Sequence, residues 1–286
     1  MEGIKISLLD AFVNAALRED VKDGDHTSLA CIDPEAVDTA KLIVKDKGVI
    51  AGIDFAEFVF RKLEPDCKFE RFIKDGSEVK YGDIAFEVTC KSQNLLKGER
   101  LALNTMQRLS GVSSMSRKFA NLVNDLPVTI LDTRKTTPLM RFLEKWAVRV
   151  GGCTNYRDGL YDWIMIKDNH NDACGGISKA IKKVKAYLAA NNKDLGITVE
   201  VRNLTELNEV LDEGGITRIM LDNFELETLR KAVKIIDKKF EAEASGGVNL
   251  STVRDIAETG VDFISVGALT HSAGSLDMSL KIKKDS

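Results

Sequence analysis

The sequence of 286 residues is poor in histidine and cysteine, and the positions of these residues exclude several kinds of site. Its three histidines, His26, His170 and His271, are too few and too widely separated for a histidine metal cluster. No Ser-His-Asp arrangement is apparent either. The odd number of cysteines and the lack of a Cys-x-x-Cys pair indicate free thiols instead of a disulfide framework or a zinc site. The five cysteines are Cys31, Cys67, Cys90, Cys153 and Cys174.

Neither sign of charge is in large excess, and long apolar runs are absent. The formal net charge of −3 leaves no surplus of basic residues to neutralise phosphates, which argues against general nucleic-acid binding. No apolar run approaches the length that spans a membrane, and residues 1–5 lack the layout of a signal peptide. With 44% hydrophobic and 30% charged residues the composition is that of a globular protein. We therefore expect a cytoplasmic protein with no membrane or nucleic-acid partner.

From residue 128 onward, short apolar runs alternate with amphipathic helical patterns such as residues 204–211 and 225–236. This alternation predicts parallel βα units. The strands number fewer than in a closed α/β barrel, so we expect an incomplete or open barrel whose gap is covered by other parts of a dimer. The six predicted strands span residues 128–131, 163–166, 197–201, 218–221, 240–244 and 263–266.

The first part of the chain lacks this alternation of strands and helices, and its pattern predicts a mixed domain of helices and an antiparallel sheet. Helical patterns cover residues 8–19 and 54–62, and a long helix over residues 99–122 leads into the first barrel strand. We predict a mixed α+β domain over residues 1–105 and an α/β barrel over residues 106–269. Residues 270–286, which include a short amphipathic segment over residues 276–284, are expected to pack back on the first domain. The alternating segments of the first domain are residues 40–44, 48–51, 68–72 and 84–88.

The predicted barrel strands end in polar or glycine-rich turns, where parallel α/β barrels carry their catalytic groups. The order of these turns along the chain is cations first, then carboxylates, then glycines, and chance would not produce such sorting. We therefore predict an enzyme active site at this edge. In chain order the strand ends supply Arg134 and Lys135, Lys167 and Asp168, Glu200, Asp222, Ser245-Gly246-Gly247, and Gly267.

The most informative turn is Leu131-Asp132-Thr133-Arg134-Lys135-Thr136-Thr137-Pro138. Pro138 blocks further strand pairing, so Arg134 and Lys135 stand side by side at the end of the strand. Arginine offers a planar fork for a carboxylate or phosphate, and lysine a compact point charge. Taken alone, such a segment is more often a charged turn. Its repetition at successive strands favours a site for an anionic substrate.

Glu200 and Asp222 end neighbouring strands and suit a magnesium ion, which binds through one or two carboxylates together with substrate phosphates. The alternative is that Glu200 and Asp222 are structural carboxylates that form ion pairs with Arg134, Lys135 and Lys167. The two interpretations are compatible, because a site without its anions would contain those same ion pairs.

The two glycine turns, Ser245-Gly246-Gly247 and Val266-Gly267-Ala268, let backbone N–H groups approach a phosphate closely. A Gly-Gly pair alone is more often a plain turn, and Arg100 alone reads as a solvated helix charge. Residues 151–157 resemble a tight loop that presents Arg157, although this segment taken alone is as readily a plain turn. The composite chemistry fits a reaction between a polyanionic sugar phosphate and a small carboxylated acceptor, in which a metal and cations stabilise departing pyrophosphate. No covalent nucleophile stands out.

With these residues in view, the sequence closely resembles the quinolinate phosphoribosyltransferase family, also called nicotinate-nucleotide pyrophosphorylase (carboxylating). The resemblance covers nearly the whole chain, and its motifs are long and occur in the same order. They are Glu19-Asp20 with Gly24-Asp25 and Thr27-Ser28, Lys47-Gly48-Val49-Ile50-Ala51-Gly52, Glu99-Arg100 with Leu103-Asn104, Leu109-Ser110-Gly111, Asp132-Thr133-Arg134-Lys135-Thr136-Thr137-Pro138, Glu144-Lys145-Trp146-Ala147-Val148, Ile166-Lys167-Asp168-Asn169-His170, Leu221-Asp222-Asn223-Phe224, Glu243-Ala244-Ser245-Gly246-Gly247 and Val266-Gly267-Ala268-Leu269-Thr270-His271-Ser272.

The resemblance implies the transfer of a phosphoribosyl group from phosphoribosyl pyrophosphate to quinolinate with decarboxylation, a step of NAD biosynthesis that uses magnesium and no organic cofactor. It also implies an N-terminal α/β sandwich domain joined to an incomplete parallel α/β barrel, in a homodimer with active sites shared across the interface, and higher oligomers are compatible with it. The implied quinolinate ligands are Arg134, Arg157 and Lys167, with Tyr156 beside them and Arg100 from the partner subunit. Lys135 serves both substrates, and Glu200 and Asp222 lie near the ribose and magnesium. Lys135, Glu200 and Asp222 are thus the implied catalytic residues, and Ser245, Gly246, Gly247, Gly267 and Ala268 form the implied 5′-phosphate cradle, with His271 nearby.

Four positions depart from the family pattern. Tyr156 stands where a histidine is usual, and Arg202 where an acidic residue is frequent. Leu139 and Cys153 each replace a glycine, and we interpret Cys153 as a small buried thiol in a glycine-like slot. Tyr156 can still donate a hydrogen bond, so this departure leaves the expected reaction unchanged.

Two other functions compete with this one. A related phosphoribosyltransferase that uses nicotinate without decarboxylation would need fewer cations than Arg100, Arg134, Arg157 and Lys167 provide, because nicotinate has one carboxylate and quinolinate two. A non-catalytic anion-binding module would not need Glu200 and Asp222 together with Lys135.

Overall fold

A computed structural model describes residues 1–283 and divides the chain into two compact units. The first unit comprises Met1–Arg117, Thr137–Gly152 and the described residues from Ser272 onward, and the second comprises Lys118–Thr136 and Cys153–His271. Lys284, the last residue of the amphipathic segment expected over residues 276–284, lies outside the described residues, as do residues 285 and 286. The predicted domain boundaries at residues 105 and 269 stay predictions.

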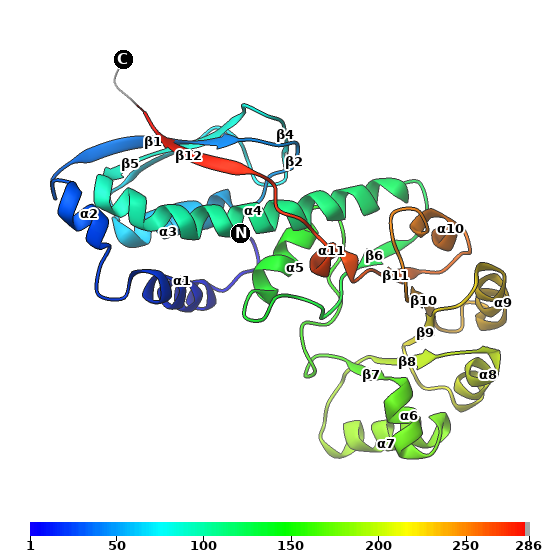
Figure 1. Ribbon diagram of the computed structural model, residues 1–286. Helices are drawn as coiled ribbons and strands as arrows, with labels where there is room; N and C mark the ends of the chain where they lie inside the picture. Colours follow the sequence, from blue (N-terminus) through cyan, green and yellow to red (C-terminus); the bar gives the residue numbers. More distant parts are fainter. Residues whose placement is uncertain (284–286) are drawn as a thin grey trace. The chain divides into compact units, whose positions relative to one another are not determined.

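The first unit is built on an antiparallel four-stranded sheet in the order β12-β1-β5-β3 (Figure 1). Along β1 the side chains of Ala40, Leu42 and Val44 are buried, and their neighbours in sequence are more exposed, as expected for a strand with one covered face. A small second sheet pairs β2 with β4. The strands are β1 (Val37–Val44), β2 (Gly48–Val49), β3 (Lys68–Arg71), β4 (Glu78–Val79), β5 (Ile84–Lys91) and β12 (Met278–Ile282).

The long helix α4 covers this sheet and shares its hydrophobic core. Leu103 and Met106 of α4 are buried with Leu42 and Phe86 of the sheet. The helix begins at Ser92, earlier than the expected residue 99, because residues 92–98 continue its helical hydrogen bonding without interruption. The helices of the first unit are α1 (Ile6–Val21), α2 (His26–Cys31), α3 (Ile53–Leu63), α4 (Ser92–Leu122, up to Arg117) and α5 (Arg141–Val150).

The second unit contains a parallel six-stranded sheet in the order β6-β11-β10-β9-β8-β7. Each strand matches one of the six predicted apolar runs within two residues at either end. Strands β6 and β7 are the two edges, so the described backbone forms an open barrel, as predicted. The strands are β6 (Thr129–Leu131), β7 (Ile164–Ile166), β8 (Ile197–Val201), β9 (Arg218–Asp222), β10 (Glu241–Ser245) and β11 (Phe263–Ser265).

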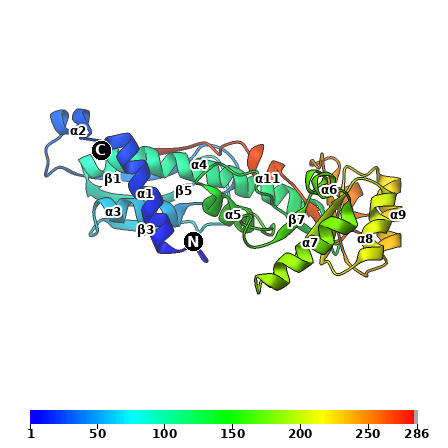
Figure 2. The same ribbon diagram turned by 90° about the horizontal axis from the view of Figure 1, so that it is seen from below.

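The crossover helices of the second unit follow one another around the outer side of the sheet (Figures 1 and 2). Leu207 and Val210 of α8 and Leu229 and Ala232 of α9 are buried, so each helix turns one apolar stripe inward. The expected α/β class, with an N-terminal sandwich and an incomplete parallel barrel, is confirmed. The helices are α6 (Asp168–Cys174), α7 (Ile177–Ala190), α8 (Leu204–Glu213), α9 (Leu226–Ile236), α10 (Val253–Ala257) and α11 (Ala268–His271).

Candidate active site

Asp132, at the end of β6, fixes the loop that carries Arg157. Its fully buried carboxylate accepts hydrogen bonds from Asn155 Nδ2 at 2.6 Å and from the Tyr156 backbone N–H at 2.8 Å. The chain just before these residues forms an isolated parallel bridge between Thr154 and Leu131. Charge-assisted hydrogen bonds of this kind are strong, so the loop is held along the edge of the barrel at β6.

As a consequence, two guanidinium groups come close together at this edge of the barrel. Burial lowers the pKa of Arg157 from its ordinary value, and the positive charge of Arg134 lowers it further. Arg157 Nη1 donates to the carbonyl oxygen of Trp163 at 3.2 Å, which holds the side chain in place. Two neighbouring arginines repel each other, and a bound anion relieves that repulsion.

Lys167 and Glu200 form an ion pair at the ends of β7 and β8. Lys167 Nζ lies 2.8 Å from Glu200 Oε2, and only 9% of the Glu200 side chain is exposed against 45% of Lys167. His170 supports this strand end, because its Nδ1 accepts a hydrogen bond from the Lys167 backbone N–H at 2.9 Å. This ion pair is what the sequence analysis expects if Glu200 is a structural carboxylate paired with a cation. The lysine is partly exposed, so it remains accessible to an anion.

Lys135, Gly267 and His271 are packed against one another at the ends of β6 and β11. A Cβ added at Gly267 would lie 3.0 Å from Lys135 Cδ and 2.9 Å from the His271 ring. The Thr270 hydroxyl donates to the Lys135 carbonyl oxygen at 2.7 Å. Gly267 therefore has to be small, because the lysine and the histidine already fill the space beside it.

The glycine turn after β10 lies beside Asp222 and Asn223. The Asn223 N–H donates to the Ser245 carbonyl oxygen at 2.8 Å, and Asn223 Nδ2 donates to Asp222 Oδ2 at 2.7 Å. Gly246 has a φ of +96°, and a Cβ there would come within 2.2 Å of Asn223 Oδ1. Both backbone conformation and space thus require glycine at this position.

Asp222 is partly exposed and Glu200 is paired, and no group of three or more metal-ligating side chains occurs among residues 1–283. A divalent cation here would have two protein carboxylates and would need substrate oxygens and water to complete its shell.

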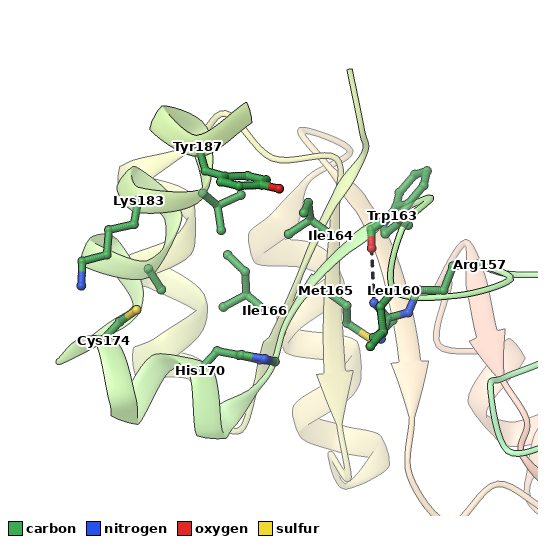
Figure 3. Close-up of a pocket in the computed structure, with 12 residues that line it drawn as sticks. Arg157, Leu160, Trp163, Ile164, Met165, Ile166, His170, Cys174, Lys183 and Tyr187 are labelled. Carbon is green, nitrogen blue, oxygen red and sulfur yellow. Dashed lines mark hydrogen bonds between the residues drawn. The ribbon is translucent and has the colours of Figure 1, made fainter. Parts of the chain in front are cut away.

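A cavity of about 400 Å³ lies between β7 and the helices α6 and α7 (Figure 3). Arg157 is at one end of it, and the rest of the lining is mostly apolar. Such a lining does not suit two carboxylates and a sugar phosphate, and Lys135, Lys167, Glu200 and Asp222 are not part of it. The lining residues are Arg157, Leu160, Trp163, Ile164, Met165, Ile166, His170, Cys174, Ala180, Lys183, Val184 and Tyr187.

Of the predicted site residues, all but one lie in the second unit. Most are at β-strand ends or in the turns that follow them, whereas Tyr156 and Arg157 lie in the loop between α5 and β7, and Ala268 and His271 are the first and last residues of α11. The exception is Arg100, which belongs to α4 in the first unit, where its side chain is 67% exposed. The residue assignments stay predictions, although the ends of the strands do bring Arg134 to Arg157, Lys167 to Glu200, and Lys135 to Gly267 and His271.

The departures from the family pattern have different structural settings. Leu139 adopts a left-handed backbone with φ +65° and is 87% exposed, a conformation that glycine adopts more readily than leucine. Cys153 is buried, in agreement with its interpretation as a small thiol. Arg202 donates to Glu206 Oε1 at 2.8 Å on the surface of α8. Tyr156 points into the barrel interior, where its hydroxyl lies 2.5 Å from Thr198 Oγ1.

Two residues that support the site, Asp132 and Arg218, were not predicted as site residues from the sequence. Asp132 was visible only as part of a charged turn, and its partners lie more than twenty residues further on. Arg218 opens strand β9 with a buried side chain. The signal that could have found it is the alternation of Glu241 and Glu243 on the next strand, which places carboxylates on the same face.

The fold and the strand-end cations define a class of protein, namely an open-barrel α/β protein whose cations gather at the C-terminal edge of its parallel sheet. Two family models match the chain. Quinolinate phosphoribosyl transferase, N-terminal domain, matches residues 25–110, and quinolinate phosphoribosyl transferase, C-terminal domain, matches residues 112–281. The chain belongs to the quinolinate phosphoribosyltransferase family, which confirms the expectation from the sequence motifs.

Relatives and solved structures agree with this membership. The chain is 43% identical to quinolinate phosphoribosyltransferase [decarboxylating] 1b of Nicotiana tabacum over 96% of its own length and 82% of that protein. It is 39% identical to the probable nicotinate-nucleotide pyrophosphorylase [carboxylating] of Bacillus subtilis, covering 96% and 93%. The crystal structure of NadC from Streptococcus pyogenes superposes with a TM-score of 0.92 at 36% identity, covering 99% of this chain and 100% of that one.

Proposed function

We propose that the protein transfers the phosphoribosyl group of phosphoribosyl pyrophosphate to quinolinate and releases pyrophosphate and CO₂, with nicotinate mononucleotide as the product in NAD biosynthesis. The observation that carries this proposal is the pair of arginines, Arg134 and Arg157, that Asp132 and the Trp163 carbonyl hold together at the barrel edge. With the exposed ammonium of Lys167, they offer three cations to a planar dicarboxylate.

The chemistry needs no organic cofactor. The pyridine nitrogen of quinolinate attacks C1′ of the ribose, and the C1′–O bond to pyrophosphate breaks with its electron pair on the leaving group. The ring nitrogen becomes positive, so the bond from C2 to its carboxylate can break, and its electron pair stays on the ring while CO₂ departs. A proton then adds at C2. The protein holds two polyanions together, and its cations offset their repulsion.

In this assignment each group of residues has one task. Arg134, Arg157 and Lys167 bind the two carboxylates of quinolinate, with Tyr156 next to them. Lys135 lies between the two substrates. The turn of Ser245, Gly246 and Gly247 and the turn of Gly267 and Ala268, near His271, cradle the 5′-phosphate with backbone N–H groups.

Magnesium fits the residues present, with Asp222 as the better carboxylate because Glu200 is already paired with Lys167. A bound magnesium ion would neutralise charge on the departing pyrophosphate. Glu200→Gln and Asp222→Asn should then lower kcat far more than they weaken quinolinate binding. Full kcat combined with lost quinolinate affinity in both variants would contradict this role.

We further propose a homodimer in which Arg100 of one subunit completes the site of the other, and a cytoplasmic location. Exposure of Arg100 supports the first proposal. For the second, none of the helices in the described chain has the length and apolar character needed to cross a bilayer.

The decisive experiment mixes purified protein with phosphoribosyl pyrophosphate, magnesium chloride and either quinolinate or nicotinate. Formation of nicotinate mononucleotide and CO₂ from quinolinate supports the proposal. Product from nicotinate alone, without CO₂, would identify the non-decarboxylating transferase instead. Binding of either acid without any product would identify a non-catalytic anion-binding protein.

A further inference from the structure

The interior of the barrel below the strand ends contains a buried cation that the reaction does not use directly. The side chain of Arg218, on β9, is only 8% exposed and lies 2.8 Å from Glu241 Oε2 and 3.2 Å from Glu243 Oε2. Barrels of this kind usually fill their interior with branched apolar residues. A buried ion pair often gives no more stability than well-packed apolar side chains, so its presence calls for another reason.

Three aromatic rings surround the Arg218 guanidinium. Its Cζ lies 3.7 Å from the ring centroid of Phe263, 4.9 Å from that of Tyr156 and 5.7 Å from that of Trp163. Tyr156 and Trp163 also contact each other edge to face, with centroids 6.0 Å apart. These distances are within the range of cation–π attraction, which is strongest where water is excluded.

Tyr156 and Trp163 are further tied together by one hydroxyl group. Thr198 Oγ1 lies 2.5 Å from the Tyr156 hydroxyl and accepts from Trp163 Nε1 at 2.9 Å. Burial raises the pKa of Tyr156, and the negative charge of Glu243 raises it further, so its hydroxyl keeps its proton. The two rings therefore form one neutral, hydrogen-bonded unit around the cation.

This unit is connected to Arg157 at both ends. Tyr156 immediately precedes Arg157 in the chain, and the carbonyl oxygen of Trp163 accepts the hydrogen bond from Arg157 Nη1 at 3.2 Å (Figure 3). A displacement of either ring would thus move the backbone or the guanidinium of Arg157. The link from Arg218 to the glycine turns assigned to the 5′-phosphate is less direct, because it passes through Glu243 to the Ser265 hydroxyl, which donates to Glu243 Oε1 at 2.5 Å and lies two residues before Gly267.

We propose that Arg218 is a positioning residue for the acceptor acid: by clamping Tyr156 and Trp163, it fixes Arg157 in the orientation that binds a quinolinate carboxylate. This inference rests on the proposed function and extends it to a residue inside the barrel. It assigns to the buried charge cluster of Arg218 and Glu243 a role in the selection of the acid, separate from phosphoribosyl pyrophosphate binding.

The test compares Arg218→Lys with wild type in steady-state kinetics. Lysine keeps the charge and loses the planar fork that reaches two carboxylates and stacks on rings. The quinolinate KM should rise roughly ten-fold or more, as for a lost charge-assisted contact, while the KM for phosphoribosyl pyrophosphate and kcat change by less than about two-fold. Arg230→Lys, the same change on the outer surface of α9, is the matched control and should behave like wild type.

A double-mutant cycle separates positioning from general damage. If Arg218 acts through Arg157, Arg218→Lys should change the quinolinate KM by less than about two-fold in an Arg157→Lys background. A fully additive effect, or a rise of both KM values together, would overturn the proposal, as would an unchanged quinolinate KM in a folded Arg218→Lys protein.

Should Arg218→Lys fail to fold, Arg218→Met combined with Glu243→Gln removes both buried charges and leaves neither unpaired, and the same criteria apply to it. These experiments distinguish a failure of the proposed function from a failure of this inference. A wild-type protein without quinolinate activity refutes the function itself, whereas an active wild type with an indifferent Arg218 refutes only this inference.

Discussion

At the scale of single residues, Arg134 and Arg157 place two like charges close together at the proposed quinolinate site. Burial and the neighbouring charge both lower the pKa of Arg157, yet arginine remains protonated at any ordinary pH. The two guanidinium groups therefore repel each other, and a dianion bound between them, as we propose for quinolinate, would offset that repulsion. Asp132 makes this possible, because its hydrogen bonds hold the loop in spite of the repulsion.

Removal of either arginine tests the site directly. Arg134→Ala or Arg157→Ala should raise the quinolinate KM or abolish turnover, because a lost charge-assisted pair costs about 1.5–3 kcal/mol. Steady-state kinetics with quinolinate as the varied substrate provide the measurement, and circular dichroism checks the fold. Wild-type kinetics in both variants would remove these arginines from the site.

The chemical types at the strand ends could be predicted from the sequence because each strand is an apolar run that stops abruptly at polar residues. The links between these residues could not. Asp132 accepts hydrogen bonds from Asn155 and Tyr156, and Arg218 contacts Tyr156 and Trp163 of the segment before β7 and Phe263 of β11. Such contacts depend on the curvature and register of the sheet, which periodicity alone does not encode.

At the scale of elements, α4 depends on a glycine in its middle. Gly111 packs so closely on the segment before β12 that a Cβ would lie 1.7 Å from the carbonyl oxygen of Gly274. Glycine is normally unfavourable in a helix by roughly 0.5–1 kcal/mol relative to alanine. Here the close approach of the two backbones outweighs that preference.

Gly111→Ala should therefore destabilise the protein, although it improves helix propensity. Overpacking costs about 1–3 kcal/mol, more than the propensity gain. Gly274→Ala is the matched control, because a Cβ at that position meets nothing within 4 Å. Urea denaturation should give a lower midpoint for Gly111→Ala and little change for Gly274→Ala, and the reverse order would contradict this account of the packing.

The short helix α2 predicts a pH effect. Asp25 caps it by accepting from the Ser28 side chain and from the Ser28 N–H, which lowers the pKa of Asp25 below its ordinary value of 3.8. A carboxyl group with a lowered pKa contributes stability above its unfolded pKa and loses it as the pH falls through the folded value. Asn caps helices without titrating.

The stability difference between wild type and Asp25→Asn should consequently shrink as the pH is lowered from about 5 to about 3. Urea denaturation of both proteins at each pH measures it, and Asp25→Ala, which removes the cap at every pH, should cost about 1 kcal/mol near neutrality. A difference that stays constant across this range would show that the Asp25 charge is irrelevant to the cap.

The elements themselves were largely predictable. The six parallel strands follow from apolar runs, and the α8 and α9 patterns from amphipathic periodicity. The segment before residue 283 was expected only as an amphipathic stretch, and it is the strand β12, paired with β1. Its pairing partner is more than two hundred residues earlier, so local pattern could not reveal that it is a sheet edge.

At the scale of the whole molecule, the proposed shared site predicts that two inactive variants can complement each other when their subunits are mixed. Arg100 belongs to the first unit, and Lys167 to the second. If a site combines the second unit of one subunit with Arg100 of its partner, an Arg100→Ala subunit paired with a Lys167→Ala subunit contains one site with both mutations and one with neither. Mixing the two inactive proteins with subunit exchange should then restore roughly a quarter of wild-type activity, as expected for random pairing in a two-fold dimer.

The matched control mixes Lys167→Ala with Arg134→Ala. Both residues belong to the second unit, so every site in that heterodimer carries one mutation, and activity should not return. Native mass spectrometry verifies that heterodimers form in both mixtures. If verified heterodimers of Arg100→Ala and Lys167→Ala stay inactive, Arg100 does not act across the interface. If the control mixture regains activity as well, the recovery has another cause than a complete shared site, and the composite site would have to be abandoned.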